Sequence, residues 1–284
     1  MSAVITASVP VIDLEEQARI RAEKRERLGR WLIPTLVVIL SIVLWDRLVV
    51  WNEIPHYIVP RPYRVWDELV KDWPFLLSAL QTTLSTTFLG LGIAVVGGVL
   101  LAILFNQSKW AEMSFFPYAV ILQVTPIVAI FPIINGYIDS RMTKLLLATW
   151  LVAFFPILSN TTMGLRSVDN NLRDLFRLNG ATRWQTLLHL QLPAALPYFL
   201  SGLKIAGGLA LIGAIVAEFV AGATGKSFGL ASVIIEASYR LNRPRSFAAL
   251  GLIALAGVAI FIATSTFAWF MLRKWHESAI KRDA

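Results

Sequence analysis

The chain has 284 residues, of which 56% are hydrophobic and only 15% are charged. A soluble globular domain carries about a quarter charged residues, so this composition indicates a protein embedded in a lipid bilayer. The net charge of +8 fits Lys and Arg held on the cytoplasmic side of a membrane. We expect no nucleic-acid partner, because no basic run is interleaved with exposed aromatic residues. The absence of cysteine excludes disulfides and thiolate metal sites.

Long apolar runs predict an all-α integral membrane protein with six transmembrane helices. The six spans are expected at about 31–50, 75–105, 117–138, 145–165, 198–222 and 246–272. The chain then divides into a cytoplasmic N-terminal helix or tail, the first span with its external connection, a five-helix core and a cytoplasmic tail. These four parts cover residues 1–30, 31–74, 75–272 and 273–284.

Six spans place both termini on one side of the membrane. Lys and Arg are more numerous in the two tails and in the connections 106–109 and 166–197 than in the other connections. This distribution predicts that the termini are cytoplasmic and that the protein lies in the plasma (inner) membrane. The connections 51–74 and 223–245 are expected to be external, the first irregular and the second polar. Pro126 and Pro132 should kink the third span.

The polar loop at 166–197 holds the densest series of helix start and stop signals in the chain. Asp169 can cap a first short helix, and Asn179 and Gly180 can end it in left-handed conformations. Thr182, followed three residues later by Gln185, forms a capping box for a second short helix. The pattern predicts a helix, a glycine turn and a second helix between two spans. We interpret this loop as a docking element.

Two prolines should close this loop. Pro193 is expected to stop the second short helix, and Pro197 should stand in the first turn of the next long helix. That long helix carries a face of small residues, for which packing within the chain and a subunit interface are equally good explanations. The face comprises Gly202, Ala206, Ala210, Gly213 or Ala214, Ala217 and Ala221.

Two ionisable residues within the fifth span are costly to bury and are candidates for the translocation pathway. Lys204 could instead extend to the inner surface, because it lies about two turns from Pro197. Glu218 could pair with a nearby external Arg or could line an outward-facing vestibule.

No catalytic, metal or cofactor site emerges from the sequence. Gly225-Lys226-Ser227 resembles the end of a phosphate-binding loop, but the required upstream glycine is replaced by Val220 and the segment follows a membrane helix. The three histidines are scattered without ligand spacing. We therefore expect a transport subunit that is not an enzyme and has no ATPase of its own.

The loop resembles the cytoplasmic loop of ABC-type importer permeases of the binding-protein-dependent class. Its pattern is Glu-Ala-Ala, three residues, Gly, nine residues and Ile-x-Leu-Pro. Gly180 matches the glycine, Leu190 stands for the Ile, and Leu192-Pro193 match the ending. The residues Asp174-Leu175-Phe176 occupy the Glu-Ala-Ala positions, with two bulky residues in place of small ones.

Further short motifs are similar to the nitrate, sulfonate, taurine and bicarbonate branch of this class and its relatives. Gly164-Leu-Arg-Ser-Val-Asp169 and Gly202-Leu-Lys-Ile-Ala206 are two of them. Gln123-x-x-Pro126 resembles the start of a third-span motif and adds both residues to the pathway candidates. The resemblance covers about residues 60–272.

The resemblance implies a type I ABC importer permease arrangement. Permeases of this class work as dimers, of two copies or with a sister permease, and couple to a dimer of separate cytoplasmic ATPases, which use the ATP. An external binding protein delivers the substrate. The coupling residues would be Asp174, Leu175, Phe176, Gly180 and Ala181, supported by the second half of the motif. The substrate would be a nitrate-, sulfonate- or taurine-like anion, or a pyrimidine, thiamine-precursor or riboflavin-like compound.

A secondary transporter driven by an ion gradient is the alternative from another class. Such transporters use interrupted spans and acidic residues near the membrane midplane. Only Glu218 and the kinked third span point that way, and the capped loop would then have no role.

Overall fold

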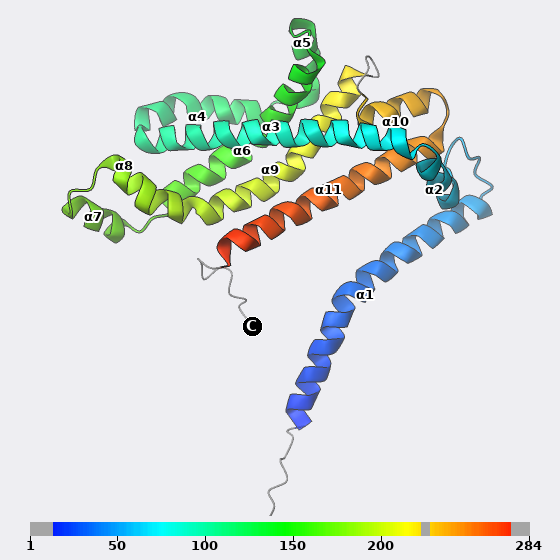
Figure 1. Cartoon of the computed structure of the whole chain (residues 1–284), viewed down its shortest axis with the longest axis horizontal. Coiled ribbons are helices and arrows are strands. Elements are labelled where there is room, and N and C mark those ends of the chain that lie inside the picture. Colours follow the sequence, from blue (N-terminus) through cyan, green and yellow to red (C-terminus); the bar gives the residue numbers. More distant parts are fainter. Residues whose placement is uncertain (1–13, 223–227, 274–284) are drawn as a thin grey trace, which may run out of the picture. The chain divides into compact units, whose positions relative to one another are not determined.

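A computed structural model describes residues 14–222 and 228–273, and every regular element within them is helical (Figure 1). The chain divides into two units, Met1–Tyr63 and Arg64–Ala284. The expectations for residues 1–13, for Gly225–Ser227 and for most of the C-terminal tail lie outside the described residues.

The first unit is built on one long helix, α1 (Leu14–Trp51), which contains Pro34 without a break. Its segment Leu32–Trp51 is apolar and long enough to cross a membrane. Near the end of this segment, the Asp46 carboxylate accepts hydrogen bonds from Nε and Nη2 of Arg61 at 2.9 and 3.0 Å. This two-pronged ion pair satisfies the carboxylate close to the apolar run.

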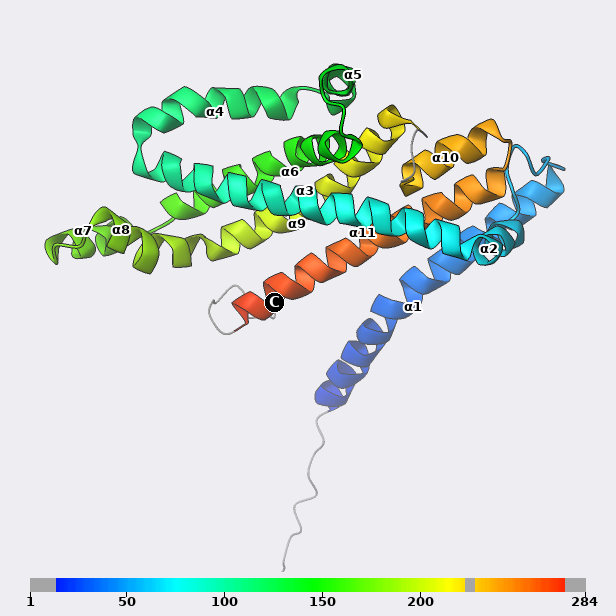
Figure 2. The same ribbon diagram turned by 45° about the horizontal axis from the view of Figure 1, so that its top comes forward.

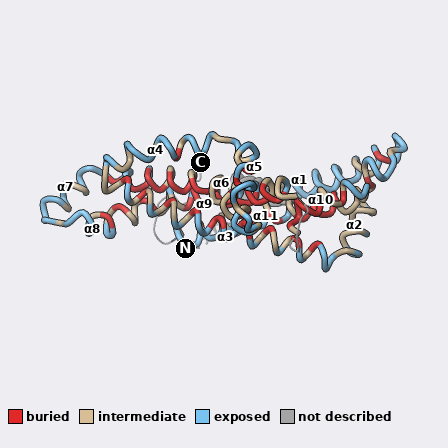
Figure 3. Tube along the Cα trace, turned by 90° about the horizontal axis from the view of Figure 1, so that it is seen from above, coloured by how far each residue is buried: buried red, intermediate tan, exposed pale blue. Residues whose placement is uncertain are grey.

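Four long helices of the second unit run side by side (Figures 1 and 2). They are α3 (Trp73–Gln107), α6 (Arg141–Arg166), α9 (Leu192–Ala221) and α11 (Arg243–Leu272). The largest buried cluster lies where α3, α6 and α9 meet, and Figure 3 shows buried residues concentrated along these helices. The small-residue face of α9 packs within the chain. A Cβ on Gly202 would lie 2.8 Å from the Pro156 carbonyl oxygen, and one on Gly213 would lie 3.0 Å from the Thr149 Cα.

The third predicted span is not one kinked helix. It consists of α4 (Lys109–Val124) and α5 (Ile127–Tyr137), which are bent by 101°. The break falls at Pro126, which precedes α5 as its N-cap, whereas Pro132 lies inside α5 without interrupting it. A proline cannot extend a preceding helix but can stand at the start of a new one. Within the described residues, five helical segments could each span a membrane, or six if this bent pair counts as one.

The expectations of an irregular first connection and a polar second connection were both wrong. Residues 51–74 contain the ten-residue helix α2 (Pro62–Lys71), and residues 223–245 contain α10 (Leu230–Tyr239). Five residues of α10 are buried: Leu230, Ala231, Ser232, Val233 and Ala237. Both helices pack against one apolar cluster, to which the start of α3 and the start of α11 also contribute.

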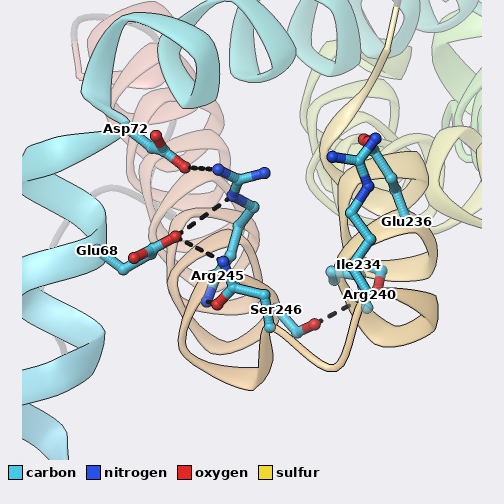
Figure 4. Close-up of polar contacts among 8 residues, drawn as sticks. Glu68, Asp72, Ile234, Glu236, Arg240, Arg245 and Ser246 are labelled. Carbon is cyan, nitrogen blue, oxygen red and sulfur yellow. Dashed lines mark hydrogen bonds and ion pairs between the residues drawn. The ribbon is translucent and has the colours of Figure 1, made fainter.

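An ionic network ties α2 to the start of α11 (Figure 4). The guanidinium of Arg245 forms ion pairs with Asp72 and with Glu68, the latter at 3.5 Å. Asn242 Nδ2 donates a 2.7 Å hydrogen bond to the same Glu68 carboxylate. The network therefore fixes α2 against the end of the bundle opposite the loop.

Candidate functional site: a docking loop and a bent span

The first loop helix is α7 (Asn170–Leu178), and its two ends have the predicted signals. The Asp169 carboxylate accepts a 2.8 Å hydrogen bond from the Asn171 backbone N–H, which satisfies one of the free donors at the helix start. At the other end, Gly180 adopts a left-handed conformation with φ of +70°. The structure thus confirms both local capping predictions.

The helix ends in a Schellman motif. The Ala181 N–H donates to the Phe176 carbonyl and the Gly180 N–H to the Arg177 carbonyl, both at 3.0 Å. Asn179 was expected in a left-handed conformation, but its φ is −83° and it serves as the C-cap. One left-handed residue is sufficient in this motif, so Asn179 keeps an ordinary backbone.

The second loop helix, α8 (Arg183–Thr186), begins with the predicted capping box. The Gln185 N–H donates to Thr182 Oγ1 at 3.2 Å, and the Thr182 N–H donates to Gln185 Oε1 at 2.8 Å. Both donors at the helix start are therefore satisfied reciprocally.

The prediction that Pro193 stops this helix was wrong. A π-helical turn, η1 (Leu187–Gln191), follows α8 directly and leads into α9, where Pro193 lies in the first turn and Pro197 in the interior. The Leu192 N–H donates to the carbonyl of Leu187, five residues earlier. The wider turn lets the helix continue where the proline has no N–H to donate.

The motif residues divide into an exposed set and an anchored set. Asp174, Leu175 and Gly180 are exposed, and Phe176 and Ala181 are half-buried. The second half of the motif, Leu190, Leu192 and Pro193, is half-buried, and Leu192 packs against the main core. The first half is therefore accessible, while the second half joins the loop to the bundle.

An apolar surface on the loop was not singled out from the sequence. Five large apolar side chains, which we call the docking surface, remain exposed: Leu172 at 47%, Leu175 at 52%, Leu178 at 86%, Trp184 at 63% and Leu188 at 56%. Figure 3 shows α7 and α8 as mostly exposed. The three leucines of α7 recur at every third position, and this spacing in a polar loop was the available signal.

The base of the loop is held rigidly. Leu187 is 1% exposed within the main core. Gln191 Oε1 accepts a 2.6 Å hydrogen bond from Asn106 Nδ2 at the end of α3. The docking surface is therefore attached to the helices that form the core.

The bent span brings two of the four pathway candidates together. Gln123 and Pro126 line a cavity of about 310 Å³ at the junction of α4 and α5. The opposite wall includes Leu151, Val152 and Pro156 of α6 and Leu209 of α9. The lining is mainly apolar, with the Gln123 amide and the Thr125 hydroxyl as its polar side-chain groups.

The other two candidates lie elsewhere. Lys204 is half-buried on α9 and does not line the cavity at the junction of α4 and α5. Glu218 is fully buried, at 0% exposure. Their roles in the pathway remain predictions.

Glu218 is held by neighbours from two other helices. Its Oε1 accepts a 2.8 Å hydrogen bond from Thr83 Oγ1, and its Oε2 accepts a 3.0 Å bond from the Ala231 N–H. The same Thr83 hydroxyl accepts a 2.9 Å bond from the Leu230 N–H. Arg141 acts on the carboxylate electrostatically from the start of α6.

These contacts cap the start of α10 with side chains that are distant in the sequence. Its own N-cap residue, Gly229, has no side chain to accept the first free N–H groups, so α3 and α9 supply the acceptors. A Cβ at Gly229 would overlap the Glu218 carboxylate. The site therefore requires a glycine, a hydroxyl and a carboxylate from three separate segments.

Comparisons with known proteins agree with this architecture. The pattern of the binding-protein-dependent transport system inner membrane component family matches residues 94–281. A probable ABC transporter permease protein of Haemophilus influenzae is 32% identical over 82% of this chain and 94% of its own length. The formylaminopyrimidine transport permease protein ThiX of Halalkalibacterium halodurans is 31% identical over 81% of this chain and 90% of its own length. The riboflavin transport system permease protein RibX of Chloroflexus aurantiacus is 30% identical over 92% of this chain and 96% of its own length.

Solved structures share the fold at low sequence identity. An amino acid ABC transporter crystallised with histidines matches with a TM-score of 0.58 at 19% identity, over 73% of this chain and 97% of that chain. The MetNI methionine ABC transporter matches with a TM-score of 0.52 at 18% identity, over 68% of this chain and 92% of that chain. The match to the family pattern and to the three relatives shows that the chain belongs to the family of inner membrane components of binding-protein-dependent transport systems, and that it is an ABC importer permease.

Proposed function

We propose that this permease is driven by a separate cytoplasmic ATPase that docks on α7 and the start of α8. The observation that carries the proposal is the docking surface: apolar side chains left exposed on a helix with capped ends and a rigid base. Exposing leucines to water is unfavourable for a loop that has no partner, whereas a groove on a partner protein would bury them. The loop then lies in the cytoplasm, and so do both termini.

The remaining parts of the transporter follow from the same proposal. Two permease subunits, either two copies of this chain or one copy with a sister permease, form the pathway, and an external binding protein delivers the substrate. In this proposal the chain is a transport subunit without catalytic or cofactor-binding residues of its own, and ATP is hydrolysed in the partner. Glu218 gives the ion-gradient alternative no support, because its carboxylate is buried and hydrogen-bonded, and the capped loop would have no role in such a transporter.

For the substrate, we infer a small organic compound with a heteroaromatic ring, similar to a pyrimidine, a thiamine precursor or riboflavin. The cavity at the bend of the third span is mainly apolar and offers an amide and a hydroxyl. Such a lining suits a flat ring with hydrogen-bonding edges better than nitrate, a sulfonate or taurine, which need convergent positive charge. The names of the ThiX and RibX relatives point in the same direction.

The first test is co-purification of the tagged permease with its ATPase. Leu175→Asp places a charge in the proposed contact. Burying the rest of a half-exposed leucine contributes about 1 kcal/mol, and placing a charge in the apolar groove costs more. We expect about hundredfold weaker binding of the ATPase. Leu241→Asp is the matched control, because Leu241 is 63% exposed at the opposite end of the bundle.

A second pair of variants tests the glycine turn. Gly180→Val should disrupt the loop, because a β-branched residue resists φ of +70°, whereas Gly180→Asn should be tolerated. Space does not decide this outcome, since nothing lies within 4 Å of a Cβ built on Gly180. ATPase stimulation should fall in the first variant and persist in the second, while both insert normally. Full coupled hydrolysis in Leu175→Asp and Gly180→Val would refute the docking proposal.

A further inference from the structure

A basic cavity lies beside the docking surface, and none of the five apolar side chains of that surface lines it. Its volume is about 710 Å³, and it is an open cavity between the turn that joins α3 to α4 and the loop. Four cationic residues line it: Lys109, Arg173, Arg177 and Arg183. No acidic residue is among its lining residues in the described part of the chain.

The positive charge in this cavity is largely uncompensated. Arg177 is paired with Asp174 at 3.6 Å, but both side chains are more than 60% exposed, so the pair is weak. The buried Nε of Arg173 has no hydrogen-bond partner within the described residues. Because buried donors almost always have partners, this Nε lacks an acceptor that the described residues would normally supply.

An adjoining cavity of about 440 Å³ shares Lys109 and Arg173 with the first. Its one carboxylate, Glu112, is paired with Arg166. The neighbouring acid is therefore already engaged by another cation.

The position of the cavity indicates a membrane surface. Helix α3 is a membrane-spanning helix that ends at Gln107, and a single residue, Ser108, separates it from α4. Trp110, which also lines the cavity, is 81% exposed. Exposed tryptophans beside the end of a span are typical of the headgroup level of a bilayer. The start of α4 adds the positive end of a helix dipole.

We propose that this cavity binds a phosphate group, and that the group belongs to an anionic phospholipid of the leaflet on the loop side. Basic pockets between membrane helices at this level suit such headgroups. A headgroup bound there would bridge Lys109 of the α3–α4 turn and the arginines of α7 and α8. The lipid would then set the position of the docking loop. The inference does not depend on the ATPase, because it concerns the permease alone.

The experiment measures lipid retained by the purified full-length permease in native mass spectrometry. Phosphatidylglycerol is titrated against phosphatidylcholine in mild detergent, for the wild type and for the double variant Lys109→Gln/Arg173→Gln. Each cation near an anionic lipid contributes a factor of about five in affinity, so the double variant should bind phosphatidylglycerol about thirtyfold more weakly. Arg273→Gln is the matched control, because Arg273 ends a spanning helix on the same side and lines neither cavity. It should bind as the wild type does.

A second measurement needs no variant. Trypsin cleavage after Arg177 and Arg183 should be at least about fivefold slower in phosphatidylglycerol nanodiscs than in phosphatidylcholine nanodiscs. Cleavage after Arg240, at the opposite end of the bundle with its side chain 68% exposed, should not change. Equal lipid binding by all variants together with unchanged cleavage would overturn the proposal.

Two other outcomes would replace the lipid by another occupant. If pyrophosphate in lipid-free detergent protects the same arginines and the double variant abolishes that protection, the phosphate site stands and the lipid source is wrong. If the double variant keeps its phosphatidylglycerol but loses the ATPase, the cavity receives acidic side chains of that partner instead.

Discussion

Replacing Glu218 by alanine tests whether this residue is part of the structure or of the transport pathway. The variant removes the acceptor of the Ala231 N–H and the acceptor of the Thr83 hydroxyl, both in a fully buried site. Hydrogen bonds in membrane proteins contribute only about 0.6 kcal/mol on average. Leaving a buried donor without a partner costs more, about 1–3 kcal/mol for each. With the cavity left by the missing side chain, we expect a loss of about 4 kcal/mol.

The loss should appear as a lower melting temperature in detergent, followed by the intrinsic fluorescence of the ten tryptophans. For a protein of this size, about 4 kcal/mol corresponds to a fall of roughly 10 °C. Glu236→Ala is the control, because it removes a carboxylate from a surface ion pair on α10 and should change stability by less than about 1 kcal/mol. Wild-type stability of Glu218→Ala combined with lost transport would show that the residue serves the pathway, and our structural reasoning would be wrong.

Three further predictions concern packing, capping and the ionic network. Gly164→Val should separate α6 from α9, because its Cβ would lie 2.8 Å from the Ala195 Cα. Its melting temperature should therefore be well below that of Gly208→Val, because no atom lies within 4 Å of a Cβ at Gly208. Thr182→Ala should cost about 1 kcal/mol locally, which hydrogen exchange would detect as faster exchange at the start of α8 without change elsewhere. Arg245→Gln should remove the cation from two half-buried acids, lowering stability by about 1–2 kcal/mol. An unchanged melting curve would show that the network is only peripheral.

The local features of the loop could be predicted from the sequence because they depend on neighbouring residues. Asp169 and Thr182 each accept from a backbone group two or three positions away, and Gly180 supplies the one positive φ that the turn needs. A sequence read in short windows contains all of this information. The five unbroken membrane spans were equally accessible, because a long apolar run has one stable solution in a bilayer.

The errors arose where distant parts of the chain decide the conformation. Pro193 is accommodated by a π-helical turn whose first residue, Leu187, is buried in a core built from other helices. The segment that forms α10 carries no capping residue of its own, so its sequence gave no helix start signal. The 101° bend at Pro126 likewise exceeds an ordinary proline kink. The sequence predicted kinks at Pro126 and Pro132, but only Pro126 marks a break, and its size was not predicted.

The capping of α10 also constrains how the chain is made. Glu218 and Thr83 are 135 residues apart, so α3 is already synthesised and inserted when the carboxylate of α9 reaches the membrane. Thr83 can then receive Glu218, whereas the Ala231 N–H arrives only after a further 13 residues. During biogenesis the carboxylate thus acquires its partners one after the other. A chain that stalls between α9 and α10 would expose a half-paired acid within the bilayer, which is a feature that membrane quality control could recognise.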